Sequence, residues 1–147
     1  MEQTREAQAN WSGNLVEGKG SVRAGTSGAF PELPITWKAR TEESGGLTSP
    51  EELLAAAHAA CYSMAFSNEL SKAGFVPDRV DVTASVRANR TDAGWTVISS
   101  TLTATAKVAN ISEEQFQRIA EGAKNGCPIS RAITGNVELA VNATLER

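Results

Sequence analysis

The chain has 147 residues, 41% of them hydrophobic and 21% charged, with a formal net charge of −3. These values are ordinary for a globular protein with a sizeable core, and we expect a single domain over residues 1–147. A negative charge without any run of basic residues argues against a nucleic-acid-binding protein and against binding to an anionic membrane surface.

The start of the chain, MEQTREAQAN, is polar and lacks the apolar segment of a secretory signal. No stretch approaches the roughly 18 apolar residues that a membrane span requires. We therefore expect a cytoplasmic protein, and in that reducing compartment a permanent structural disulfide is not expected.

The first third of the sequence predicts three strands. Residues 9–25 predict a hairpin with its turn at residues 17–20, and residues 32–42 predict a third strand that carries Arg40 near its end. The three tryptophans all fall in predicted strands, where we interpret them as sheet packing. They are Trp11, Trp37 and Trp95.

A long helix after residue 49 has the clearest local pattern. Ser49 suits the N-cap, Pro50 suits the first helical position and Glu52 would complete a capping box. Gly74 is a plausible end of the helix. Apolar side chains at helical spacing predict the buried face: Leu53, Leu54, Ala57, Cys61, Met64 and Ala65. The methyl-lined face over residues 56–60 would let another helix approach closely.

The rest of the sequence predicts two strands, a helix and a last strand. Residues 78–90 and 94–108 alternate apolar and polar side chains, which predicts two strands of a hairpin. An amphipathic helix is predicted over residues 110–124 with Ser112 as its N-cap, followed by a short turn or helix start at Cys127 and a strand over residues 136–146. This order of elements indicates an α+β fold with a largely antiparallel sheet.

Cys61 and Cys127 are the only cysteines, and their chemistry has several interpretations. A free cysteine on an apolar helix is by default a small hydrophobic side chain. Cys127, however, lies between Gly126 and Pro128 at a predicted helix start, where backbone N–H groups stabilise a thiolate and lower the thiol pKa. Cys127 is therefore expected to be the more acidic thiol.

A zinc site is an alternative interpretation. His58 and Cys61 are three residues apart on one helix, and Cys127 could add a third ligand. The pattern is weak because His58 is the only histidine, and a single histidine among alanines is more often a hydrogen-bonded core residue. Dinucleotide-binding, P-loop and nucleophile-elbow motifs are absent from the sequence, so we expect thiol chemistry that needs no cofactor.

Four segments of the sequence carry a family pattern: SPEELLAAAHAACYSMA, AKNGCPIS, NWSGNLVEGKGSV and DAGW. They resemble the OsmC/Ohr family, and within it the OsmC branch. The resemblance implies an OsmC-like fold, in which a largely antiparallel sheet wraps around a long central helix, and an intertwined homodimer. It also implies a thiol peroxidase that reduces organic hydroperoxides, and hydrogen peroxide less well, in oxidative and osmotic stress defence. The implied reductant is a dithiol, such as a dihydrolipoyl group.

The resemblance implies roles for four residues. Cys61 would be the peroxidatic thiol and Cys127 the resolving thiol, joined in a disulfide during turnover. Glu51 would be the active-site glutamate, and Arg40 the arginine that pairs with it, with Arg23 as the alternative. Because apolar burial raises a thiol pKa, Cys61 needs such a cation close by.

Spacing along the long helix indicates which chain would supply Glu51. The ten residues from Glu51 to Cys61 correspond to about 15 Å of rise and about 80° of rotation. Glu51 would therefore serve the Cys61 of a second subunit whose helix packs antiparallel. Leu54, Met64 and Phe66 would line an apolar pocket that favours organic hydroperoxides. A non-catalytic dimeric stress protein that binds a small apolar ligand is the alternative from another functional class.

Overall fold

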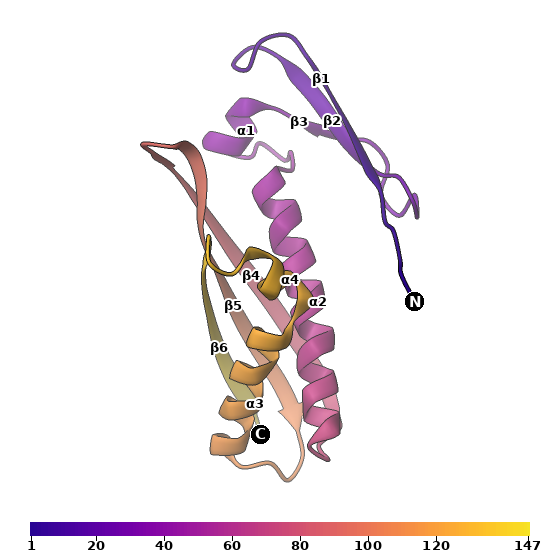
Figure 1. Ribbon diagram of the computed structural model, residues 1–147, viewed down its shortest axis with the longest axis vertical. Coiled ribbons are helices and arrows are strands. Elements are labelled where there is room, and N and C mark those ends of the chain that lie inside the picture. Colours follow the sequence, from indigo (N-terminus) through magenta and orange to yellow (C-terminus); the bar gives the residue numbers. More distant parts are fainter. The chain divides into compact units, whose positions relative to one another are not determined.

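A computed structural model of the chain describes residues 1–147 and contains two compact units, residues 1–53 and residues 54–147. Each unit has its own three-stranded sheet (Figure 1). The expectation of a single domain over the whole chain stays a prediction. No helix of the chain combines the length and the apolar character that crossing a membrane would require.

The first unit is an antiparallel sheet followed by a short helix. Its elements are β1 (Ala7–Ser12), β2 (Lys19–Ala24), β3 (Leu33–Ile35), α1 (Trp37–Thr41) and the start of α2 (Pro50–Lys72). The predicted hairpin is present, but its turn comes earlier than residues 17–20. The side-chain oxygen of Asn14 accepts hydrogen bonds from the backbone N–H groups of Val16 (3.0 Å) and Glu17 (2.8 Å), so the chain turns around Asn14.

The predicted third strand is wrong beyond its first residues. Only residues 33–35 are extended, and residues 37–41 form α1, so Arg40 lies on a helix rather than on a strand. Thr36 explains the change, because its hydroxyl accepts a hydrogen bond from the backbone N–H of Ala39 (3.1 Å) and caps the helix.

The start of α2 agrees in part with the prediction. The Ser49 hydroxyl accepts a hydrogen bond from the backbone N–H of Glu52 (3.2 Å), as the predicted N-cap requires. The Glu52 carboxylate accepts a hydrogen bond from the Thr48 hydroxyl (2.8 Å). Of the predicted capping box, the structure therefore contains the hydrogen bond that the Ser49 hydroxyl accepts. Gly74, with a φ of 90°, follows the last turn of the helix as predicted.

The second unit is a three-stranded sheet with α2 and α3 packed against it (Figure 1). Besides α2, its elements are β4 (Pro77–Thr91), β5 (Gly94–Val108), α3 (Glu113–Gly126), α4 (Pro128–Ile133) and β6 (Glu138–Glu146). The pairing of β4 with β5 is antiparallel, as predicted, whereas β6 runs parallel to β5. The predicted α+β class with largely antiparallel strands is confirmed, although the strands form two sheets rather than one.

The core of the second unit forms between α2, α3 and one face of β5. Its buried side chains on α2 recur every fourth residue: His58, Tyr62, Phe66 and Leu70. The predicted buried face is correct only in part, since Cys61 and Ala65 pack against the core but Ala57 and Met64 are exposed. The aromatic rings account for the difference. The Phe66 ring lies 5.5 Å from the Tyr62 ring and 5.4 Å from the Phe116 ring of α3, so the bulky side chains fill the core and the methyl groups remain outside.

Two caps connect α3 and α4. Ser112 and Gln115 form a reciprocal capping box at the predicted start of α3. At its end, the backbone N–H of Cys127 donates to the carbonyl of Ala123 (2.9 Å), and the Cys127 carbonyl accepts from the N–H of Arg131 (3.0 Å). Cys127 is thus both the C-cap of α3 and the N-cap of α4, which confirms the predicted helix start at this residue.

Candidate active site

Cys61 and Cys127 meet in the second unit. Cys61 is half-buried on α2, and Cys127 is fully buried at the junction of α3 and α4. Both are free cysteines, and their side chains are hydrogen-bonded to each other. The two thiols are therefore neighbours in the folded unit.

The surroundings of the two thiols favour a negative charge on Cys127. Burial raises the pKa of the Cys61 thiol, and its hydrogen bond to Cys127 raises it further. Burial also acts to raise the pKa of Cys127. The backbone N–H of Ser130, the Cys61 thiol and the Ser130 hydroxyl oppose this effect, and the pKa of Cys127 is lowered as a result. This direction agrees with the prediction that Cys127 is the more acidic thiol.

His58 lies between two serine hydroxyls in the core. Its Nδ1 is 2.7 Å from Ser100 Oγ on β5, and its Nε2 is 2.8 Å from Ser130 Oγ on α4. Burial lowers the pKa of His58, so the imidazole is neutral at pH 7. His58 is thus a hydrogen-bonded core residue, and the structure contains no group of three or more histidine, cysteine or carboxylate side chains able to hold a metal ion.

Arg40 and Glu51 form an ion pair in the first unit, as the resemblance implied. The guanidinium donates from Nε to both carboxylate oxygens (2.9 and 3.2 Å) and from Nη2 to Oε1 (2.8 Å). The guanidinium carbon also lies 5.8 Å from the ring centroid of Trp37, which is on α1 and not on the predicted strand. The cation is therefore oriented by a carboxylate and by an aromatic face. The alternative, Arg23, is exposed on β2.

A hollow of about 140 Å³ borders Arg40 within the first unit. Most of its lining is apolar, and the lining residues are Trp11, Leu15, Ile35, Thr36, Trp37, Arg40 and Pro50. Sequence reasoning missed this hollow because its walls come from three separate segments, residues 11–15, residues 35–40 and Pro50. The only signal in the sequence was the presence of two tryptophans in the same third of the chain as Arg40.

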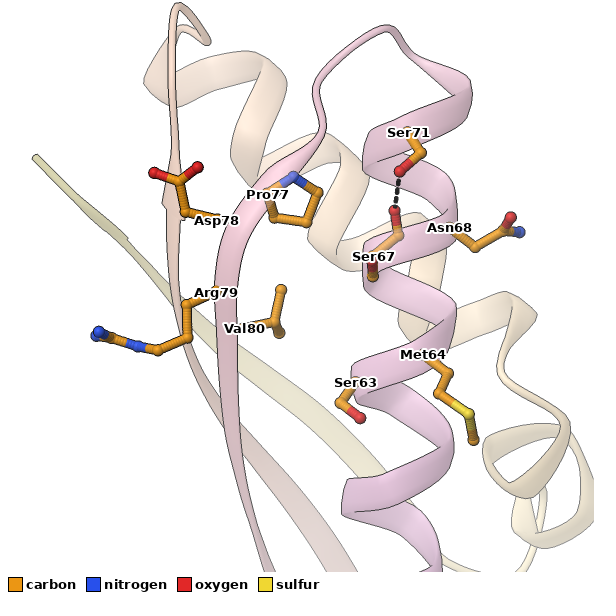
Figure 2. Close-up of a pocket in the computed structure, with 9 residues that line it drawn as sticks. All are labelled: Ser63, Met64, Ser67, Asn68, Ser71, Pro77, Asp78, Arg79 and Val80. Carbon is orange, nitrogen blue, oxygen red and sulfur yellow. Dashed lines mark hydrogen bonds between the residues drawn. The ribbon is translucent and has the colours of Figure 1, made fainter.

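The apolar pocket predicted around Leu54, Met64 and Phe66 is wrong. Phe66 is fully buried in the core. Met64 is 67% exposed and lines a different feature, an open groove of about 590 Å³ between α2 and the start of β4 (Figure 2). The groove has a largely polar helix wall, where the Ser71 hydroxyl donates to the Ser67 carbonyl (2.8 Å), and neither cysteine lines it. It carries no thiol for peroxide chemistry.

Residues 43–142 match the family described as OsmC-like protein. The chain belongs to the OsmC family. It is 39% identical over 135 residues to peroxiredoxin OsmC of Escherichia coli, a match that covers 92% of this chain and 93% of that protein. It is 32% identical over 121 residues to organic hydroperoxide resistance protein-like 2 of Staphylococcus epidermidis, which covers 80% of this chain and 82% of the relative.

Solved structures share the fold of this OsmC-family chain. An organic hydroperoxide resistance protein from Elizabethkingia anophelis has a TM-score of 0.76 at 24% identity, covering 99% of this chain and 100% of that one. OhrB of Bacillus subtilis has a TM-score of 0.73 at 22% identity, covering 96% and 98% of the two chains. The predicted OsmC-like fold is confirmed.

Proposed function

We propose that the protein is a thiol peroxidase that reduces organic hydroperoxides to alcohols through Cys61 and Cys127. The decisive observation is the hydrogen bond between the two thiols, in a chain whose relatives are named peroxiredoxin and organic hydroperoxide resistance protein. A pair of adjacent free thiols can pass from sulfenic acid to disulfide without any cofactor.

In the first step Cys61 is oxidised. Its thiolate attacks the distal oxygen of the hydroperoxide, so that an S–O bond forms and the O–O bond breaks. The alkoxide that leaves takes up the proton released when the Cys61 thiol ionised. The products are one alcohol and one sulfenic acid on Cys61.

In the second step Cys127 resolves the sulfenic acid. The Cys127 thiolate attacks the Cys61 sulfur, an S–S bond forms, and the S–O bond breaks. The leaving hydroxide combines with the proton released by the Cys127 thiol and departs as water. An external dithiol, for which a dihydrolipoyl group is our candidate, then reduces the disulfide by thiol exchange.

Ionisation of Cys61 needs a cation, and we assign this role to Arg40. Because burial raises the pKa of Cys61, a thiolate there requires a nearby positive charge, which would also stabilise the departing alkoxide. Glu51 would fix the orientation of the guanidinium. Ten helical residues, about 15 Å, separate Glu51 from the Cys61 of its own chain. The Arg40–Glu51 pair is therefore assigned to the second subunit of an antiparallel homodimer.

The apolar hollow beside Arg40 supports an organic substrate. A guanidinium bordered by tryptophan and aliphatic side chains would bind the peroxide oxygens at its charged wall and the alkyl group in the hollow. Hydrogen peroxide has no alkyl group to bury and is expected to react more slowly. Detoxification of organic hydroperoxides in the cytoplasm during oxidative or osmotic stress is the proposed physiological role.

The test is a count of free thiols, with the intact mass, after one equivalent of cumene hydroperoxide is added to reduced protein. We expect both thiols to disappear with a loss of about two hydrogens, the change for one disulfide. Cys127→Ser should retain a sulfenic acid that dimedone traps on Cys61, whereas Cys61→Ser should retain its remaining thiol. Two intact thiols in the treated wild-type protein would refute the peroxidase and favour a ligand-binding protein.

A further inference from the structure

A buried hydrogen-bond network of polar side chains runs from the sheet to the Cys127 sulfur. Ser100 Oγ contacts His58 Nδ1 (2.7 Å), and His58 Nε2 contacts Ser130 Oγ (2.8 Å). The Ser130 hydroxyl in turn hydrogen-bonds to Cys127, one helical turn away on the same segment. All four side chains are at least 99% buried. The peroxidase steps above give Ser100, His58 and Ser130 no task.

The chemistry of a neutral imidazole limits which group donates in each hydrogen bond of this network. One ring nitrogen carries a hydrogen and donates, while the other accepts. If Nε2 accepted from Ser130, the single hydroxyl hydrogen would point at His58 and could not reach the Cys127 sulfur. With the hydrogen on Nε2, Ser100 donates to Nδ1, Nε2 donates to Ser130, and Ser130 donates to the sulfur.

We propose that His58 is a positioning residue that holds the Ser130 hydroxyl as a hydrogen-bond donor to the Cys127 sulfur. A thiolate can only accept hydrogen bonds. A network whose last hydroxyl donates to the sulfur therefore stabilises Cys127 as the anion that attacks the Cys61 sulfenic acid. This inference rests on the proposed function, in which Cys127 is the resolving thiol.

The same alignment has a consequence for the reductive step. A thiol with a lower pKa is the better leaving group in thiol exchange. The incoming dithiol should therefore attack the half-buried Cys61 sulfur and release Cys127, which is fully buried, as the thiolate. The new mixed disulfide then joins Cys61 to the reductant.

Two other titratable groups face Cys127, both from α2. The Cys61 thiol is hydrogen-bonded to it. The Tyr62 hydroxyl donates to the Ala120 carbonyl (3.0 Å), and burial raises the pKa of Tyr62 above its usual range, so this phenol stays neutral. His58 is also neutral, so the hydrogen-bond network stabilises the Cys127 thiolate through aligned dipoles rather than through a full positive charge.

Ser99 offers a matched control within the same strand. It is next to Ser100 on β5 and buried, but its hydroxyl has no hydrogen-bond partner. Replacing either serine by alanine removes the same atom from the same strand. Only the change at Ser100 interrupts the hydrogen-bond network that ends on Cys127.

The experiment measures the pKa of Cys127 by the ultraviolet absorbance of its thiolate in a Cys61→Ser background, where it is the only thiol. We expect Ser130→Ala to raise this pKa by roughly one unit, the scale of one hydrogen bond to a charged group. Ser100→Ala should raise it by a smaller, measurable amount, because Ser100 reaches Cys127 only through His58. Ser99→Ala should leave it unchanged. Equal pKa values for the Ser100 and Ser99 variants would overturn the inference.

A second measurement needs no substitution in the chain. His58 is the only histidine, so NMR of the isotope-labelled imidazole nitrogens reports its tautomer without ambiguity. A hydrogen on Nε2 in the reduced protein is the expected result. A hydrogen on Nδ1 would overturn the proposed direction of hydrogen-bond donation toward Cys127.

These readouts separate the positioning role from the peroxidase itself. If cumene hydroperoxide leaves both wild-type thiols intact while the titrations follow the expected order, the proposed function fails and the alignment of Ser130 on Cys127 stands. If the disulfide forms but the Ser100 and Ser99 variants titrate alike, the peroxidase stands and His58 is only a core residue.

Discussion

Replacing Glu51 by glutamine tests whether the orientation of Arg40 matters for the reaction. The Glu51 carboxylate accepts three hydrogen bonds from the guanidinium at 2.8–3.2 Å and is 11% exposed. Glutamine keeps the shape of the side chain but removes its charge and replaces one acceptor oxygen by a donor. The variant therefore keeps the cation at the site while loosening its direction.

The expected loss follows from the strength of these bonds. A hydrogen bond to a charged group contributes roughly 1.5–3 kcal/mol, which corresponds to roughly a 10- to 150-fold loss in kcat/KM if all of it is used in the transition state. Because the Arg40 side chain is 31% exposed, water replaces part of the lost interaction. We therefore expect a reduction of about 10- to 30-fold.

The assay is the steady-state reduction of cumene hydroperoxide with saturating dithiol. Glu52→Gln is the matched control, since Glu52 is the next residue on α2 and its carboxylate accepts a hydrogen bond from Thr48. Its kcat/KM should stay within about twofold of wild type, because it leaves the Arg40–Glu51 pair intact. The same kcat/KM for the Glu51 and Glu52 variants would refute the role of the ion pair in catalysis.

Three further predictions concern the dimer, pH and the core. Refolding Cys61→Ser and Arg40→Ala chains together should recover up to about a quarter of wild-type peroxidase activity, because half of the dimers then hold one complete shared site. No recovery would show that the site lies within one chain. Because burial lowers the pKa of His58, the unfolded chain binds its proton more readily, and urea-derived stability should decline as the pH falls below 6.5. His58→Gln should flatten this decline, and an unchanged slope would contradict the assignment to His58. Phe116→Ala should cost about 3–5 kcal/mol in the same urea assay, since the ring is fully buried, and a loss below about 1 kcal/mol would contradict its place in the core.

The sequence by itself determined the features that depend on neighbouring residues. The N-caps at Ser49 and Ser112 were predictable because a cap is completed within one helical turn. Cys127 was expected at a helix start because glycine and proline flank it. Helix α1 was missed, although Thr36 caps it, because five residues are too few for a helical period to stand out.

The four proposed site residues were predicted from family motifs, but only some of their contacts were. The pairing of Arg40 with Glu51 was implied by the resemblance, whereas the aromatic face of Trp37 against the guanidinium was not. That contact requires Trp37 and Arg40 to be three residues apart on a helix, and the sequence had predicted a strand there.

Tertiary structure alone decided which face of α2 is buried and how the His58 imidazole is held in the core. Alanine, cysteine and methionine all satisfy an apolar pattern, so only packing against β5 and α3 selects the face that carries His58. A polar imidazole is stable there because Ser100 and Ser130, 42 and 72 residues away in the sequence, provide its hydrogen bonds. Hydrogen bonding and desolvation depend on distances in space, and no local pattern along the chain contains them.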